Sequence, residues 1–253
     1  PTTGSTIVNT INISGAVVRP GPVGWKEGLN LSDLFKDINK DLLPDTDLNF
    51  SYLLRLNQET MRYETYHFSL IDLLVDKLST SNLQTQDGDS VIILSRDSTI
   101  RSRQIADTID LYRNQSNTDE LEKIIRITGA VKYPGEFPIF ENSSLNDLIN
   151  AAGGFNDNAL VDSIEVSRIL LKDNGLVSPS VVEISASKNS TDADFFIPQS
   201  RDRVFVRSIQ QLDTTSSVNV RGRVRFPGSY PLNPDDTLSS IINRAGGLLD
   251  DAF

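Results

Sequence analysis

Few residues of this chain have side chains that could do chemistry. The only histidine is His67, and the absence of cysteine excludes disulfides, zinc–thiolate sites and thiol nucleophiles. Two carboxylate pairs, Asp87 with Asp89 and Asp250 with Asp251, are of the kind that glycoside hydrolysis uses. The first pair precedes a strand-like run and the second follows a predicted helix end, so we interpret both as turn residues. A lone histidine in an alternating segment is likewise more typical of a strand than of a catalyst.

Metal and phosphate sites are no better supported. Asp87 and Asp89 could approach calcium, but the segment lacks the spread of ligands of an EF-hand loop. Gly153-Gly154 looks like a phosphate-binding turn, but the predicted helix ends there, so its dipole has the wrong sign for an anion. No nucleotide-binding, esterase or metalloprotease motif occurs. The sequence therefore predicts a non-enzymatic chain, with no catalytic residue, no cofactor and no metal.

Aromatic residues beside three Pro-Gly turns are the better candidates for binding. Trp25 follows the first turn, Tyr133 and Phe137 flank the second, and Phe226 and Tyr230 flank the third. Three roles remain open for them: covering the core of their own module, contacting another module or subunit, and stacking on a glycan.

Charge narrows the range of partners. Arg221, Arg223 and Arg225 alternate, and on a strand they would share one face, suited to an acidic neighbour or an acidic polysaccharide or simply solvated. The net charge of −10 repels phosphate backbones, so we expect no nucleic-acid partner. No run of about 18 apolar residues occurs, so no helical membrane span is predicted.

An internal repeat must position these residues. A glycine followed five residues later by Pro-Gly occurs three times, at Gly15, Gly129 and Gly222, with spacings of 114 and 93 residues. Downstream, residues 144–154 (SLNDLINAAGG) recur 93 positions later as residues 237–247 (TLSSIINRAGG). The chain thus holds two complete copies of one module and part of a third.

The far ends of the first two modules also correspond. Asp89 lies 74 residues after its glycine and Asp202 lies 73 after its own, and each precedes a Val-rich strand. The first copy retains leucines at positions 31 and 34 but has no Gly-Gly at the helix end. Because the modules are nearly equal in length, the difference in spacing lies mostly between them.

Each module is predicted as β-β-α-β-β-β. A first strand ends at a Pro-Gly hairpin turn, where proline presets its own φ and glycine accepts a positive φ. The glycine inside that strand indicates a bulge or the close approach of another backbone. In the second copy the helix is capped by Ser143 or Ser144 and ends at Gly153-Gly154. This is an α+β fold, a small mixed sheet with one helix packed across it, as in β-grasp (ubiquitin-like) modules.

The predicted boundaries are a first module at 8–96, a linker at 97–121, a second module at 122–208 and the N-terminal half of a third at 216–253. The linker contains Ile105, Ile109 and Tyr112 at helical spacing, which indicates a short amphipathic helix or a solvated connection. The start of the chain lacks a signal peptide pattern, and we expect a piece of a longer protein. The third copy would leave an apolar face and a strand edge open, so we expect another chain or the second module to cover it.

These patterns together resemble the soluble-ligand-binding β-grasp (SLBB) domain, as found in outer-membrane polysaccharide export proteins. The resemblance rests on the Gly-x-Val-x-x-Pro-Gly hairpin, the Leu-rich helix ending in Ala-Gly-Gly, a strand with a terminal arginine (Arg55 and Arg168) and the late Asp-x-Val strand. It extends over most of the chain, in the three module ranges given above.

The resemblance implies a function in export. Such proteins move capsular or exopolysaccharide through the outer membrane and form rings with a periplasmic body built from these domains. It therefore implies a periplasmic location in an outer-membrane-associated protein, self-association or contact with other export subunits, and contact with polysaccharide. The alternative is a stand-alone ligand- or glycan-binding module without ring assembly. The full family pattern also has a lipidated cysteine, an export domain and often a membrane-spanning helix, and this sequence contains none of them.

Overall fold

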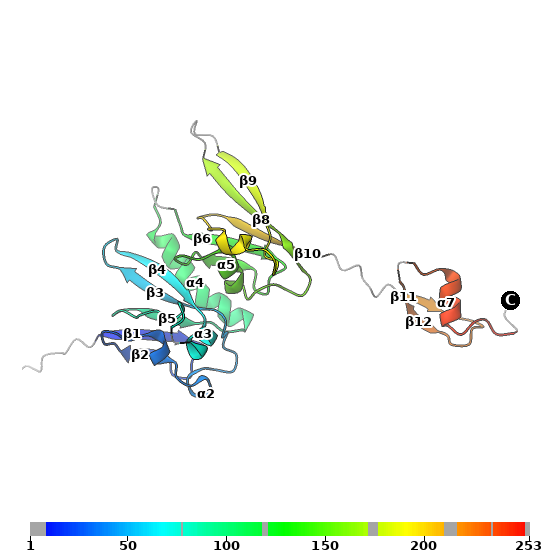
Figure 1. Cartoon of the computed structure of the whole chain (residues 1–253), viewed down its shortest axis with the longest axis horizontal. Helices are drawn as coiled ribbons and strands as arrows, with labels where there is room; N and C mark the ends of the chain where they lie inside the picture. Colours follow the sequence, from blue (N-terminus) through cyan, green and yellow to red (C-terminus); the bar gives the residue numbers. More distant parts are fainter. Residues whose placement is uncertain are drawn as a thin grey trace, which may run out of the picture. The chain divides into compact units, whose positions relative to one another are not determined.

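The computed structural model describes residues 9–76, 78–117, 121–171, 177–209, 217–233 and 235–250 (Figure 1). The chain divides into two compact units, residues 1–208 and residues 209–253, which we describe separately. The first unit contains the first two modules of the repeat, and the second unit contains the third.

The first unit contains two five-stranded mixed sheets with the same topology. Their strand orders are β2-β1-β5-β3-β4 and β7-β6-β10-β8-β9. In each sheet the first and last strands of the module pair in parallel at the centre, and all other neighbours are antiparallel. The strands of the first sheet are β1 (Thr10–Gly15), β2 (Gly21–Gly24), β3 (Ser51–Asn57), β4 (Arg62–Phe68) and β5 (Ser90–Ile93). Those of the second are β6 (Ile124–Gly129), β7 (Gly135–Pro138), β8 (Ala159–Leu171), β9 (Val177–Ile184) and β10 (Arg203–Ser208).

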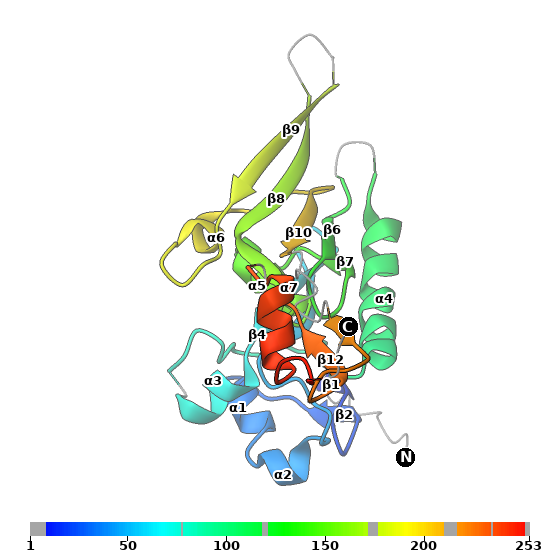
Figure 2. The same ribbon diagram turned by 90° about the vertical axis from the view of Figure 1, so that its right-hand side faces the viewer.

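Short helices cross the sheets, and one long helix connects the modules. The first module contains α1 (Leu31–Leu34), α2 (Ile38–Asp41) and α3 (Leu70–Val75), and the second contains α5 (Leu145–Ala151) and α6 (Asp192–Phe195). The connecting helix is α4 (Ser98–Gln115), which Figure 2 shows running alongside β7. The predicted α+β architecture of tandem β-grasp modules is confirmed.

The repeated strand glycine is explained by a close approach of two backbones. Gly15 and Gly129 have φ of +95° and +91°, a region that L side chains rarely adopt. A Cβ at either position would overlap the carbonyl oxygen of the parallel neighbour, that of Ile93 or Val206. The prediction of a close backbone approach is confirmed, and both constraints require glycine.

The predicted conformation of the Pro-Gly turns is wrong in two copies. Gly21 has φ of +131°, but neither Gly135 nor Gly228 has a positive φ. Each of these two is instead the first residue of a strand and pairs with the preceding strand. The hairpin already has its positive φ at the earlier glycine, so the second one can remain extended.

The helix ends of the second module follow the predicted chemistry. Ser144 is the N-cap of α5, and its hydroxyl accepts the Asp147 backbone N–H while the Asp147 carboxylate accepts that of Ser144. Gly153 and Gly154 end the helix with φ of +80° and +81°. The first module lacks this pair of glycines, and its helical segment is divided into the two short helices α1 and α2.

The second unit contains β11 (Ser217–Val220), β12 (Gly228–Pro231) and α7 (Leu238–Arg244). Its hairpin and helix repeat those of the second module, including the bridge Val224–Leu248 that corresponds to Val131–Phe155. Among its described residues there is no counterpart of β8–β10. Leu238 is 76% exposed, whereas its counterpart Leu145 is fully buried.

Candidate functional site at the joint between modules

Helix α4 joins the first two modules through one continuous core. Ile105, Ile109 and Tyr112 are buried at the spacing noted in the sequence, so the linker is a packed helix rather than a solvated connection. A single apolar cluster contains these residues, the core of the second module and four residues of the first module. Those four are Phe50, Tyr52, Ile92 and Leu94. Because one core spans both modules, they form a single packed body.

A buried arginine is at the centre of this joint. Arg101 of α4 is 1% exposed, and its Nη1 lies 2.7 Å from Oδ2 of Asp47, which is also buried. Its Nε and Nη2 donate to the carbonyl oxygen of Ala151, at the end of α5, over 3.2 and 2.5 Å. The guanidinium therefore connects a first-module carboxylate to a helix C-terminus in the second module, where the helix dipole favours a cation.

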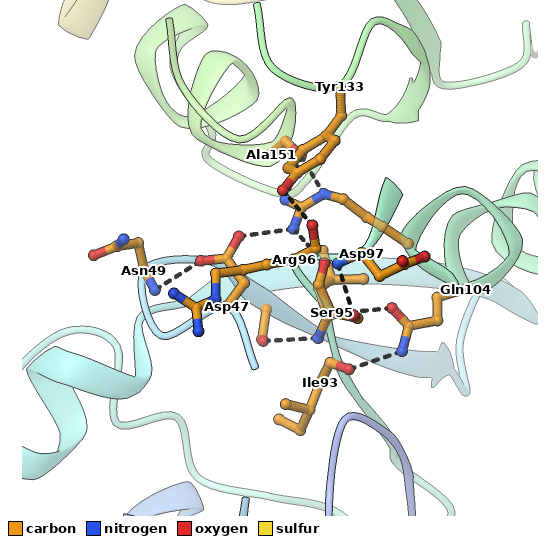
Figure 3. Close-up of polar contacts among 12 residues, drawn as sticks. Asp47, Asn49, Ile93, Ser95, Arg96, Asp97, Gln104, Tyr133 and Ala151 are labelled. Atoms are coloured by element: carbon orange, nitrogen blue, oxygen red, sulfur yellow. Dashed lines mark hydrogen bonds and ion pairs between the residues drawn. The ribbon is translucent and has the colours of Figure 1, made fainter. Parts of the chain in front are cut away.

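Tyr133 covers this arginine from the second hairpin. Its ring centroid lies 4.8 Å from Cζ of Arg101, and its hydroxyl donates to the carbonyl oxygen of Arg96 over 2.6 Å. Figure 3 shows Tyr133, Ala151 and Asp47 converging on the same place from different elements. Gly153 provides room for the tyrosine, because a Cβ there would overlap the ring. Tyr133 thus contacts the first module, one of the three roles left open for it.

Buried hydroxyl pairs extend the joint along α4. The hydroxyl of Tyr112 lies 2.9 Å from that of Thr65 on β4, and the hydroxyl of Tyr52 lies 2.9 Å from that of Thr108. Burial raises the pKa of both tyrosines. The backbone N–H of Glu141 also donates to the carbonyl oxygen of Thr65 over 2.8 Å. These contacts fix the sheet of one module against the hairpin of the other.

His67 is also part of the joint. It belongs to β4, its ring is stacked on Phe50 with 5.7 Å between centroids, and it meets Phe140 edge-on. Its Nε2 lies 3.4 Å from a carboxylate oxygen of Asp147 in the second module. The surroundings are those of a packed strand residue.

An exposed ion-pair cluster borders the joint. Glu136 of β7 pairs with Arg126 of β6 and with Arg113 of α4. The hydrogen bond from Arg126, with the charge of Arg113 beside it, lowers the pKa of the Glu136 carboxyl below its ordinary value of 4.5.

The remaining aromatic candidates lie in different surroundings. Phe137 is 2% exposed and belongs to the core of the second module. Trp25 is partly buried, and its indole N–H donates to the carbonyl oxygen of Thr85 over 3.1 Å. In the second unit Phe226 is 59% exposed and packs against Gly246, as Tyr133 packs against Gly153. Tyr230 lies under Cζ of Arg244, and its hydroxyl donates to the Phe226 carbonyl oxygen. Contact of these residues with a glycan or a subunit stays a prediction.

The shared strand face predicted for the three arginines is wrong. Strand β11 ends at Val220, and Arg221, Arg223 and Arg225 follow it within the hairpin turn. Gly222 has φ of +99°, which ends the extended run and with it the alternation of faces. All three side chains are exposed, so their role as surface contacts stays a prediction.

Both complete modules contain the same buried ion pair. Arg55 donates to both carboxylate oxygens of Asp89 over 2.9 and 2.7 Å, and Arg168 does the same to Asp202 over 2.8 and 2.7 Å. Both carboxylates are 1% exposed. The carboxylates of Asp87 and Asp89 therefore both have structural partners. Asp89 holds a strand to a turn, while Asp87 accepts the backbone N–H of Thr10.

Of the second carboxylate pair, one residue lies within the described part of the chain. Asp250 is exposed, and Asp251 lies outside the described residues. Within the described ranges, no cluster of three His, Cys, Asp or Glu residues could hold a metal ion. In the same ranges, no helix combines the length and apolar character needed to cross a membrane.

Sequence reasoning missed the central residues of the joint. Arg101 and Asp47 were not candidates, because nothing local distinguishes them from the other charged residues of a helix and a loop. The helical spacing of Ile105, Ile109 and Tyr112 was the one available signal, since a helix with an apolar face must bury it.

Comparison with known proteins supports the resemblance of the modules to the SLBB domain. The family model of the SLBB domain matches residues 124–179 and 217–253, in the second and third modules. These two segments are therefore similar to the SLBB domain, while no match covers the first module. No curated protein matches the chain.

Proposed function

We propose that this chain is a periplasmic segment of a polysaccharide export protein, and that it acts by binding and assembly rather than by catalysis. The observation that carries the proposal is the joint, where one core and a buried arginine fix two modules of the repeat as a single body. Rigid tandem modules are suited to building an assembly, because each contact made by one module orients the next. The SLBB match supports a ligand-binding role of the kind found in export proteins.

The described part of the third module exposes apolar side chains. Leu238, Phe226 and Leu248 are 76%, 59% and 63% exposed. Phe226 and Leu248 lie on two segments joined by backbone hydrogen bonds, and neighbouring exposed apolar side chains indicate a contact surface. We propose that another module covers them, either the second module or a module of another chain.

Thiol labelling tests this contact, because the chain has no cysteine of its own. In Leu238→Cys the thiol should react with a maleimide at least tenfold more slowly than in Val75→Cys, which replaces a side chain that is 82% exposed. Equal rates for the two variants would show that the surface of the third module is solvated.

Export itself is tested in the host. An in-frame deletion of codons 9–250 should abolish surface polysaccharide while polymer accumulates inside the cell, and the intact gene should restore export. Normal surface polysaccharide in the deletion strain would contradict the proposal. Alkaline phosphatase fused after residue 117 should be active if the segment is periplasmic, and an inactive, stably expressed fusion would contradict that location.

The alternative function is a stand-alone module that binds a ligand without assembling. It is favoured by one observation, an open groove in the second module with a volume of about 710 Å³. This alternative predicts ligand binding and normal export in the deletion strain.

A further inference from the structure

The space beside the repeated ion pair differs between the two complete modules. In the second module a groove of about 710 Å³ opens there, with Ile139, Phe196 and Arg168 in its wall. This volume is within the range of small-molecule sites in proteins, about 300–1,000 Å³. We call it the module 2 groove.

In the first module a tryptophan occupies the equivalent space. Trp25 corresponds to Ile139, because each follows the second hairpin strand and its backbone N–H donates to the residue before the first strand, Asn9 or Lys123. The Trp25 indole reaches across to the carbonyl oxygen of Thr85. The counterpart of Thr85 is Pro198, which lines the groove.

A second difference points to the same groove. Asn142, on its rim, has φ of +58°, and its counterpart in the first module is Gly28 with φ of +82°. The left-handed conformation favours glycine, and asparagine is one of the few other residues that adopt it. The second module therefore places an amide side chain at the rim, at a backbone position where the first module has no side chain.

Three of the four charged residues that line the groove are in ion pairs, and the fourth, Asp194, is hydrogen-bonded to a neutral amide. Of its charged lining residues, Lys123 pairs with Glu141, Arg168 pairs with Asp202, and Asp194 accepts the amide of Asn146. An ionic ligand would have to compete with these partners. An uncharged ligand would not.

The rim combines apolar and polar groups. Ile169 and Ile197 are 61% and 74% exposed, and Asn142 and Ser200 line the same groove. A pyranose ring has the matching pattern, since its C–H faces are apolar while its hydroxyls donate and accept hydrogen bonds. An extended apolar ligand would leave the amide and hydroxyl groups unmatched.

We propose that the module 2 groove binds a short stretch of neutral oligosaccharide, and that Trp25 closes the same site in the first module. This rests on the proposed function, which makes a polysaccharide the polymer that the chain encounters. The groove is then the place of contact within the two-module body.

The first test compares the chain with two variants that make the second module resemble the first. Binding of neutral hexasaccharides of glucose, mannose and galactose is measured by isothermal titration calorimetry. Ile139→Trp should weaken binding at least tenfold by filling the groove. Asn142→Gly should weaken it several-fold without lowering the melting temperature, because glycine accepts the same backbone conformation. The matched control is Val75→Trp, which adds the same ring to an exposed position far along the chain and should leave affinity unchanged.

Binding to the intact chain is then mapped by NMR, which requires no variant to fold. Shifts should concentrate at Asn142, Ile169 and Ile197. The proposal is overturned if no neutral hexasaccharide binds, if shifts map elsewhere, or if Asn142→Gly and a folded Ile139→Trp retain full affinity. Preferential binding of an acidic hexasaccharide or of an extended peptide would also overturn it. Export in the deletion strain is independent of these results, so failure of the groove and failure of the export function are distinguishable.

Discussion

Removing the buried arginine of the joint should destabilise the protein far more than removing an exposed arginine of the same helix. Arg101→Met retains most of the apolar stem but leaves the buried Asp47 carboxylate without its cation and the Ala151 carbonyl without two donors. Breaking a buried ion pair in this way costs about 3–5 kcal/mol. Because whole domains are stable by only about 5–15 kcal/mol, the loss is a large fraction of the total.

The control is Arg113→Met, on the same helix and at the same joint. Arg113 has a side chain that is 46% exposed and pairs with Glu136 at the rim. Solvent screens such a pair, so we expect a loss of at most about 1 kcal/mol. Urea unfolding monitored by tryptophan fluorescence and by far-ultraviolet circular dichroism gives both free energies of unfolding.

A double-mutant cycle isolates the pair itself. Asp47→Asn removes the charge and retains an acceptor, and its combination with Arg101→Met should cost about 1–3 kcal/mol less than the sum of the single changes. If Arg101→Met costs no more than Arg113→Met, the joint is held by its apolar core alone. The assignment of Arg101 as its centre would then be wrong.

Three further predictions concern the same joint. Gly153→Ala should destabilise more than Gly154→Ala, although both have the same backbone conformation, because only the first added methyl meets the Tyr133 ring; melting temperatures compare them. Tyr133→Phe should cost about 1 kcal/mol in urea unfolding, the typical value of one hydrogen bond. Because the partnership with Arg126 lowers the Glu136 pKa, its contribution to stability is present above pH 4.5 and disappears as the pH falls through the lowered pKa. The stability difference between the chain and Glu136→Gln should therefore shrink as the pH falls below 4.5, and a difference that does not change with pH contradicts the assignment.

The sequence was sufficient to predict the repeated parts of the fold. The succession of strands along each module, the caps of α5 and the close approach at Gly129 all follow from local chemistry that appears more than once along the chain, whereas the order of the strands within the sheet was not predicted. The two errors have local causes as well. Gly222 ends the strand on which the arginines were placed, and Gly135 starts a strand where a turn conformation was expected.

The joint could not be predicted, for a physical reason. Arg101 meets Asp47 and Ala151, each at least 50 residues away along the chain, and the contacts depend on how two complete sheets are oriented. The module 2 groove could be predicted only in part. The exchange of Trp25 for Ile139 is visible in the aligned repeats, but only the sheet register shows that both residues face the same space.

The groove belongs either to the fold that both modules share or to the second module alone. Changing residues of the first module to those of the second distinguishes the two. Trp25→Ile removes a ring that packs against the core of the first module and should open a second groove there, at a stability cost below the roughly 3–5 kcal/mol typical of Trp→Ala. With Gly28→Asn added, the rim amide is restored as well. If the shared sheet and ion pair suffice to build the site, the stoichiometry of neutral hexasaccharide binding should rise from one to two. If it stays at one in a folded double variant, the site depends on residues particular to the second module, such as those of the long β8–β9 hairpin.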